Sequence, residues 1–345
     1  MSNKGEDNRP NLAIDQRLAE RLLEKKRELD QYRPLPPGIV RKLHEDLRVT
    51  ITYNSNAIEG NSLSLNETKL VIENGLTVGS HPLKDYLEAT NHARAFDLMT
   101  RLAQNKEPFS LEIIKELHKL VMQGIDESAG QFRTGQVYIT GAAHTPPPGR
   151  EVLEYIQGWV SSIERGDYQG LDPVSRAAIA HHDFEYIHPF FDGNGRTGRL
   201  ILNLLLLRAG YTPALIQTDW RIRYITALQA ASSRRNYRPI INLVGRAVEL
   251  SLDLYLEACT QVPEEIYERA SHLAQQYGYR ANYLGWLIRY GRVSGIKRGR
   301  YWYTTHAAIE RYQTEVEAGQ YPGGRPKNLA SLSVLKPVTP PEGDE

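Results

Sequence analysis

The sequence predicts a mainly α-helical protein with one short β-hairpin and a small C-terminal module. Leucines recur at helical spacing within charged surroundings, as at Leu18, Leu22 and Leu29, which is typical of an amphipathic helix. An apolar run at residues 200–207, closed by Gly210, is shorter than the roughly 20 residues of a membrane span and predicts a buried helix. β-branched and aromatic residues gather at residues 136–140 between two glycines and predict strand structure there.

Composition limits the function classes. The chain has 345 residues, 41% of them hydrophobic and 24% charged, which is ordinary for a globular protein of two or three domains. A net charge of +1 argues against a globally basic nucleic-acid binder, although a local basic patch stays open. The single cysteine, Cys259, excludes an intramolecular disulfide and favours a reducing, cytoplasmic setting. Residues 1–10 are polar and show no sign of a secretory signal.

Further helices follow from apolar spacing and from glycine or proline stops. Ser110 is expected to cap one of them, and Gly60 and Gly124 are expected to end two others. The predicted helices are residues 12–29, 39–59, 66–74, 84–103, 110–123, 152–165, 174–186, 222–231 and 239–257.

Residues 188–199, His-Pro-Phe-Phe-Asp-Gly-Asn-Gly-Arg-Thr-Gly-Arg, carry the chemistry. They would form the loop and first turn of the helix that continues through residues 200–207, where backbone N–H groups attract anions. The turn Gly193, Asn194, Gly195 can surround a phosphate with N–H donors, and Arg196 and Arg199 can reach the same side of the helix. Two further side chains complete this set, His188 as a proton acceptor near neutral pH and Asp192 as a hard oxygen ligand for Mg²⁺.

This stretch resembles the signature of the Fic family, His-Pro-Phe-x-Asp-Gly-Asn-Gly-Arg-x-x-Arg, at every fixed position. Resemblance of lower specificity extends over residues 15–250. It implies a Fic helical core and transfer of AMP from ATP, with Mg²⁺, to a Ser, Thr or Tyr hydroxyl of a protein. It also implies that His188 is the base, that Asp192 holds the metal and that Phe190 anchors the loop in the core. The backbone at residues 193–195 would bind α- and β-phosphate oxygens, and Arg196 and Arg199 the outer phosphates.

The end of the helix at residues 39–59 carries a second resemblance. A glutamate in a last turn has the wrong sign for the helix dipole, so Glu59 is anomalous there. Ser55, Glu59 and Gly60 match the family's inhibitory motif, Ser/Thr-x-x-x-Glu-Gly/Asn. The resemblance implies that Glu59 pairs with Arg199, misplaces ATP and restrains the enzyme.

Two other regions are expected beside the site. The segment Gln136, Val137, Tyr138, Ile139 and Thr140 resembles the family's flap, a hairpin whose edge registers a target segment by strand addition. Tyr224, Leu228 and Tyr237 are candidates for a pocket around the nucleotide base, with ordinary core packing as the alternative. His118 is expected to be a packed or half-exposed histidine.

The adjacent His182 and Asp183, preceded by His181, also occur as a pattern in metal-dependent phosphohydrolases. Such enzymes need further ligands at distant positions, and no obvious set stands out in the sequence. We therefore interpret His181 as a structural residue in the helix that leads to the signature.

After Pro263 the sequence changes character. Helices are predicted at residues 264–277 and 281–290, two strands around residues 297–299, and a last helix from a cap at Thr305 to residue 312. Between Arg269 and Ile309 there are seven Lys or Arg and no Asp or Glu. The pattern resembles winged helix-turn-helix domains and implies DNA binding, with packing on the enzyme or recruitment of a protein target as alternatives. The candidate DNA contacts are Arg280, Arg289, Lys297, Arg298 and Arg300.

The expected organisation has four parts. Residues 1–105 form a helical region with the inhibitory helix, residues 106–258 the catalytic core, residues 263–315 the winged module and residues 316–345 a flexible tail. The partners expected are ATP, Mg²⁺, a protein substrate that includes the protein itself as a candidate, DNA, and a second copy in a homodimer, but no membrane. Three alternatives stay open: transfer of UMP, phosphocholine or phosphate; removal of AMP with Glu59 positioning a water; and a DNA-binding regulator in which the site is a sensor.

Overall fold

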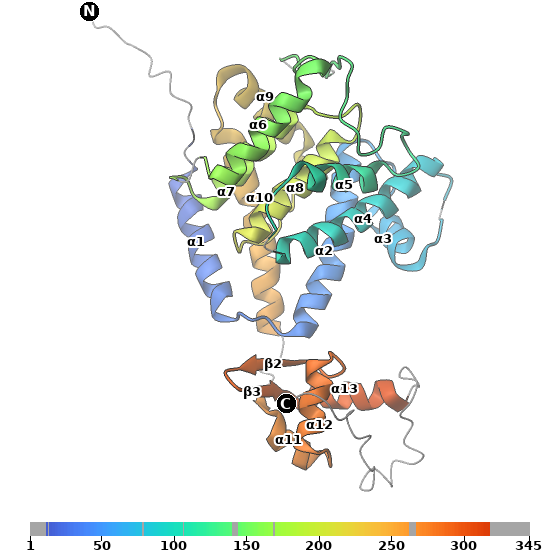
Figure 1. Cartoon of the computed structure of the whole chain (residues 1–345), viewed down its shortest axis with the longest axis vertical. Coiled ribbons are helices and arrows are strands. Elements are labelled where there is room, and N and C mark those ends of the chain that lie inside the picture. Colours follow the sequence, from blue (N-terminus) through green and yellow to red (C-terminus); the bar gives the residue numbers. More distant parts are fainter. Residues whose placement is uncertain are drawn as a thin grey trace, which may run out of the picture. The chain divides into compact units, whose positions relative to one another are not determined.

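The computed structural model describes residues 12, 14–77, 79–105, 107–139, 144–167, 170–261 and 267–317. These residues form two compact units (Figure 1). The first unit draws on residues 1–31 and 44–256, and the second on residues 32–43 and 257–345. Among the described residues, no helix combines the length and the apolar character needed to cross a lipid bilayer.

The first unit is helical and draws on both the expected N-terminal region, except residues 32–43, and the expected core, except residues 257–258. Its helices are α1 (Gln16–Gln31), α2 (Pro37–Ile58, in this unit from His44), α3 (Leu65–Asn74), α4 (Leu83–Gln104), α5 (Leu111–Met122), α6 (Val152–Arg165), α7 (Pro173–Ile187), α8 (Asn194–Arg208), α9 (Arg221–Arg234) and α10 (Arg238–Gln261, in this unit to Leu256). Two short 3₁₀ turns, Gly149–Glu151 and Thr218–Trp220, precede α6 and α9.

Helix α8 is the centre of this unit. It packs against α4, α5 and α7. Leu200, Ile201 and Leu204 are each 0% exposed, because a helix that is apolar on all sides is stable only when neighbours surround it. Phe190, just before α8, is also 0% exposed and lies in the same core cluster as Phe184. The core therefore anchors the loop that precedes α8 through Phe190.

Two helix starts show how local sequence sets the boundaries. Ser64 and Glu67 form a reciprocal capping box at α3, and Asp172 caps α7 by accepting hydrogen bonds from two backbone N–H groups. Ser110 occupies the expected N-cap position of α5 with an extended backbone, but its side chain makes no capping hydrogen bond to the helix backbone. Its hydroxyl instead bonds the Glu112 side chain and helps to lower the pKa of that carboxyl, after the larger effect of a backbone hydrogen bond.

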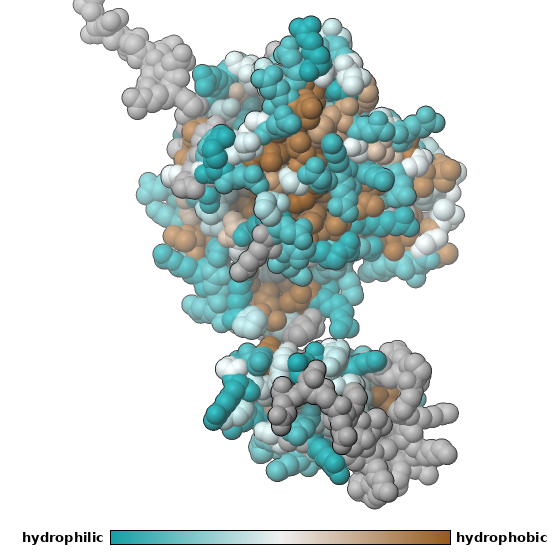
Figure 2. All heavy atoms as spheres, in the orientation of Figure 1, coloured by the Kyte–Doolittle hydropathy of each residue, from teal (hydrophilic) through white to brown (hydrophobic). Residues whose placement is uncertain are grey.

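Most of the surface drawn in Figure 2 is hydrophilic. Apolar residues gather there in patches near the middle of the first unit. Single exposed apolar side chains are normal for globular proteins, and the large apolar side chains of α8 lie inside.

The expected strand at residues 136–140 is not present where the structure describes it. Residues 136–139 are irregular, and Thr140 lies outside the described residues. A strand needs a partner to satisfy its backbone groups, whereas here the Gln136 side chain donates to the carbonyls of Val137 and Pro146, at 3.0 and 3.1 Å.

The second unit is a small α/β module. It contains β1 (Glu268–Arg269), α11 (Ala270–Gln276), α12 (Ala281–Arg289), β2 (Gly295–Arg298), β3 (Tyr301–Thr304) and α13 (His306–Glu317). The sheet order is β1-β3-β2, all antiparallel, with Lys297 opposite Trp302. Leu273, Leu284 and Ile309 are each 0% exposed in its core. The helix expected at residues 264–277 is thus too long, because residues 268–269 pair with β3.

Candidate active site

The turn between α7 and α8 presents the motif. Helix α7 ends at His188, whose φ of 51° lies in the left-handed region, and α8 begins after Gly193, whose φ is 74°. The first intrahelical bond of α8 runs from Thr197 N–H to the Gly193 carbonyl at 3.0 Å. The N–H groups of residues 194–196 therefore have no intrahelical partner and form an anion cradle.

Asn194 supports the turn rather than offering its side chain to a ligand. Its side-chain oxygen accepts from Phe190 N–H and its amide donates to the Phe190 carbonyl, both at 2.9 Å. The residue is 2% exposed. Asn194 can therefore contribute to phosphate binding only through its backbone N–H, which is the group that the family resemblance implied.

A carboxylate lies over the cradle. A Cβ on Gly195 would stand 2.3 Å from Glu59 Oε1 and 3.1 Å from Arg199 Nη1. Only glycine therefore lets Glu59 reach the start of α8, where the positive end of the helix dipole favours an anion.

Glu59 and Ser55 both hold Arg199. Arg199 Nη2 lies 2.7 Å from Glu59 Oε1 and donates to the Ser55 carbonyl at 2.8 Å, while Nε donates to Ser55 Oγ at 3.0 Å. Burial is the largest single influence on the pKa of Arg199 and acts to lower it, but the charge and hydrogen bond of Glu59, together with Tyr224 and Glu185, raise the pKa overall. Glu59 follows α2 in a turn that continues through Gly60, whose φ is 99°. Of the three residues expected to be inhibitory, Ser55 and Glu59 thus contact Arg199 directly, and Gly60 follows Glu59 in the turn.

Arg196 meets a different carboxylate, which the sequence analysis missed. Its Nη1 lies 2.9 Å from Oε1 of Glu88 on α4, and Nη2 lies 3.8 Å from Asp192 and 3.5 Å from the sulfur of Met122. Lys84, one turn before Glu88, lies 4.0 Å from Asp192. These residues follow no motif, and only their i,i+4 spacing on α4 could have indicated a shared face.

The environment of His188 favours its neutral imidazole. Burial, with smaller contributions from Arg133 and His144, lowers the pKa of its imidazole to about 4. At neutral pH the ring is uncharged and can accept a proton. Its Nδ1 has no hydrogen-bond partner among the described residues.

Arg133 fixes the backbone around His188 and was also missed. Its side chain is 1% exposed and donates to the carbonyls of His188 at 2.7 Å, Gly135 at 2.8 Å and Pro147 at 2.7 Å, with a longer bond of 3.2 Å to that of Ile187. One guanidinium thus joins the catalytic turn to both ends of the segment that contains residues 136–139. An arginine in a loop gives no sequence signal for this role.

His118 braces the turn from below. Its ring stacks on Phe190 with centroids 3.5 Å apart. Gly130 N–H donates to Nδ1 at 2.9 Å, so the proton sits on Nε2, which donates to the Asp192 carbonyl at 2.9 Å. Asp192 itself has a 54% exposed side chain, which leaves its carboxylate available to a ligand.

Glu185 is a second acid near Arg199, half-buried and with a shielded carboxyl oxygen. Its Oε1 is shielded from solvent without a hydrogen-bond partner among the described residues, and it would contact a Cβ on Gly198. Burial raises the pKa of this carboxyl to about 8, and the charge of Glu59 adds to the effect. The position of Glu185 in the sequence, about one helical turn before His188, did not predict that its carboxyl would be shielded near Arg199.

The candidate base-pocket residues surround two histidines. Tyr224 is 3% exposed, with its hydroxyl 2.7 Å from His181 Nε2 and its ring 5.9 Å from the Arg199 guanidinium. Tyr237 packs edge-on against His182 at 4.9 Å, and Leu228 is half-buried. His182 contacts Asp183 and Ser232, each at 3.0 Å. Among the described residues no three His, Cys, Asp or Glu side chains are placed to hold a metal ion, so the hydrolase alternative gains no ligand set.

The expected target-docking segment presents an aromatic side chain. Tyr138 is 80% exposed, and Phe191, within the motif, is 47% exposed. A Cβ on Gly135 would stand 3.3 Å from the Phe191 ring, so this glycine lets the segment approach the motif closely.

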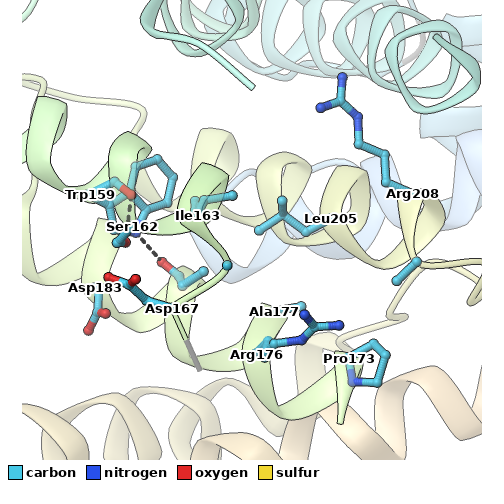
Figure 3. Close-up of a pocket in the computed structure, with 13 residues that line it drawn as sticks. Trp159, Ser162, Ile163, Asp167, Pro173, Arg176, Ala177, Asp183, Leu205 and Arg208 are labelled. Carbon is cyan, nitrogen blue, oxygen red and sulfur yellow. Dashed lines mark hydrogen bonds between the residues drawn. The ribbon is translucent and has the colours of Figure 1, made fainter. Parts of the chain in front are cut away.

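A pocket of about 270 Å³ lies elsewhere, among α6, α7 and α8 (Figure 3). Three of its charged residues have partners of their own. Asp183 pairs with His182, Asp167 with Arg165, and Arg208 donates to the Leu102 carbonyl. Trp159 in its wall donates to the Ala180 carbonyl at 3.1 Å. We assign no chemistry to this pocket.

Comparisons with known proteins agree with the geometry at the turn. Residues 108–206 match the family model described as Fic/DOC family. The chain is 34% identical over 258 residues to the protein adenylyltransferase Fic of Culex quinquefasciatus, a match that covers 73% of this chain and 50% of that protein. For the protein of the same name from Aedes aegypti the identity is 33%, with the same coverage. The chain thus spans about half the length of the curated relatives that it matches.

Solved structures give the same picture for the fold. A Fic domain containing signaling protein from Bacteroides thetaiotaomicron superimposes with a TM-score of 0.63 at 27% identity, covering 72% of this chain and all of that one. Fic-1 from C. elegans gives a TM-score of 0.63 at 29% identity, covering 70% of this chain and 73% of that one. The part of the chain that matches the Fic/DOC family model, residues 108–206, thus contains the turn between α7 and α8.

Proposed function

We propose that the protein transfers AMP from ATP to a hydroxyl of a protein substrate. The observation that carries the proposal is the arrangement at the start of α8: a neutral His188 imidazole, the N–H groups of residues 194–196, and two buried arginines on one helix face. Arg199 Nη1, buried without a hydrogen-bond partner among the described residues, lies beside the cradle and suits a phosphate oxygen. The names of the relatives support the same activity.

The reaction balances with these groups. The hydroxyl oxygen attacks the α-phosphorus, its proton passes to His188, and the bond to the bridging oxygen breaks, so that pyrophosphate leaves. In-line geometry and neutralised phosphate charge are what the protein contributes. A Mg²⁺ ion would neutralise phosphate charge when bound. Asp192 fits that role, because its exposed carboxylate is a hard oxygen ligand and Mg²⁺ commonly binds through one or two carboxylates together with phosphates.

Glu59 restrains this activity in the proposal. Its carboxylate stands over the cradle and on Arg199, the two places that an outer phosphate needs. Residues 136–139 would dock the target, because their backbone has no strand partner in the described part of the chain and remains available to an incoming segment.

Labelled ATP tests the proposal. We expect α-labelled ATP with Mg²⁺ to label protein with the Glu59→Gly variant, much less with wild type, and not with Glu59→Gly/His188→Ala. The Glu59→Gly gain should be about tenfold or more, since a hydrogen bond to a charged group is worth about 1.5–3 kcal/mol. Label from γ-labelled ATP would identify phosphate transfer instead. Absence of protein label in every sample, with lysate present, would contradict AMP transfer.

Two alternative reactions at the same site are tested in parallel assays. UTP and a CDP-choline donor test the transfer of other groups, and AMP-modified protein incubated with wild type and Glu59→Gly tests removal. Loss of AMP with wild type alone would assign Glu59 to water positioning.

Nucleic-acid binding by the second unit is a second candidate function. Arg280, Arg289, Lys297, Arg298 and Arg300 are all exposed. Several cations lie over aromatic rings of β3, as Arg298 does over Tyr303 at 5.5 Å. Under the winged helix-turn-helix proposal α12 enters the major groove and the turn between β2 and β3 contacts phosphates. Duplex DNA should bind with an affinity that falls as salt rises, and Lys297→Ala/Arg298→Ala should reduce that salt dependence by about two phosphate contacts. Equal, salt-independent binding by both proteins would contradict it.

A further inference from the structure

The turn at residues 59–61 contains the carboxylate that pairs with Arg199 and contacts the carboxylate that pairs with Arg196. Glu59 contacts Arg199 directly, at 2.7 Å. Two residues later, Asn61 Nδ2 donates to Glu88 Oε2 at 2.9 Å, and the other oxygen of Glu88 lies 2.9 Å from Arg196 Nη1. The turn at residues 59–61 is therefore one contact from Arg199 and two contacts from Arg196.

The Glu88–Arg196 pair is buried. The two side chains are 7% and 3% exposed, against 40% for Glu59. A buried guanidinium that loses its carboxylate keeps an uncompensated charge, so the pair resists separation. Among the described residues, the other neighbours of this guanidinium are the Met122 sulfur at 3.5 Å and Asp192 at 3.8 Å. Glu88 is therefore its nearest anion, and the two form an ion pair at 2.9 Å rather than a well-aligned hydrogen bond.

Asn61 is itself held on several sides. Its Nδ2 also donates to the Asp85 carbonyl at 3.0 Å, and its Oδ1 accepts from Leu63 N–H at 3.0 Å. Its backbone N–H donates to the Asn56 carbonyl at 3.1 Å. The side chain thus ties the turn after α2 to the first turns of α4, which carry Asp85 and Glu88.

We propose that Glu88 is a positioning residue for Arg196, and that Asn61 couples Glu88 to the inhibitory turn. The inference rests on the proposed nucleotide site. Glu88 presets the Arg196 fork for the outer phosphates of the nucleotide, and Asn61 keeps the Glu88 carboxylate in place. The turn at residues 59–61 then acts on the two arginines in opposite senses, since it blocks Arg199 and supports Arg196.

Nucleotide binding measured by calorimetry tests the positioning role independently of turnover. In the Glu59→Gly background, Glu88→Gln should weaken ATP binding about tenfold, since one charge-assisted contact is worth about 1.4 kcal/mol or more. AMP, which lacks the outer phosphates, should bind within about twofold of the parent, a difference of only ~0.4 kcal/mol. Glu73→Gln is the matched control, because Glu73 pairs only with Lys69 in an exposed i,i+4 contact at 3.9 Å.

Equal weakening of ATP and AMP would show a general loosening of the site and overturn the positioning role, as would unchanged ATP affinity. The same preparations are assayed for transfer of AMP. A failure of Glu59→Gly to transfer, with the ATP-against-AMP contrast intact, would reject the proposed reaction but retain the role of Glu88.

A double-mutant cycle tests the coupling. In the same background, Asn61→Ala should weaken ATP binding by a smaller factor than Glu88→Gln, and the double variant should be no weaker than Glu88→Gln alone, because coupled residues are not additive. Independent, multiplicative effects would overturn the link between Asn61 and Glu88 while leaving the positioning role standing.

Discussion

The two signature arginines lie three residues apart on α8 and are both buried, yet their carboxylate partners differ. Arg199 pairs with Glu59, which follows α2 in a turn and has a 40% exposed side chain. Arg196 pairs with Glu88, which lies within α4 and is 7% exposed. An exposed carboxylate in a turn regains hydration when it leaves, whereas a buried helical one does not. The first pair is therefore suited to a reversible contact and the second to a permanent one.

Removal of each carboxylate should separate the two pairs most clearly in stability. Glu88→Ala should lower the free energy of unfolding by about 3–5 kcal/mol, because Arg196 would remain charged and buried without its partner. Glu59→Ala should change it by less than about 1 kcal/mol, because Arg199, although buried, keeps its two hydrogen bonds to Ser55 and the lost carboxylate is partly exposed. Urea unfolding at pH 7 measures both. Equal losses would remove the distinction between a reversible and a permanent pair.

Glu185 extends the comparison to an acid that has no ion-pair partner among the described residues. Burial raises the pKa of this carboxyl from 4.5 to about 8. Between these pH values the folded protein keeps a proton that the unfolded chain has already released. Its contribution to stability is then lost as pH rises from about 4.5 towards 8. Relative to wild type, Glu185→Gln should gain on the order of 2 kcal/mol between pH 5 and pH 8. Melting curves at these two pH values measure the difference, and a variant that tracks wild type at both would place an ionised Glu185 in the fold.

Lys84 should give the smallest effect. It lies 3.6 Å from Glu88 and 4.0 Å from Asp192, and its side chain is 56% exposed. Lys84→Met should change stability by less than about 0.5 kcal/mol, since exposed pairs contribute little. A loss as large as that of Glu88→Ala would mean that the lysine, rather than Glu88, neutralises the cluster. Unfolding of both variants under one set of conditions decides between them.

Local signals account for what the sequence could predict. The helices at residues 152–165 and 200–207 follow from apolar spacing and a terminal glycine, and the structure contains both within α6 and α8. The turn from His188 to Arg199 is contiguous, so its chemistry was readable as one motif. Glu88 and Arg133 approach it from other segments and carry no pattern of their own. The strand expected at residues 136–140 is wrong for its described residues, 136–139, because β propensity does not supply a partner. The strand β1 was missed because two residues are too few to show alternation.

The four carbonyls that Arg133 binds have a consequence for accuracy. One guanidinium sets the backbone position of His188 and also that of Gly135, where the segment expected to receive a target begins. The backbone of His188 and the start of that segment are thus fixed to the same planar guanidinium, and not to each other through a series of loop contacts. Only two hydrogen bonds separate the two positions. Under the proposed function, this shared anchor would hold the hydroxyl of a docked target at a fixed distance from His188, whatever the target sequence.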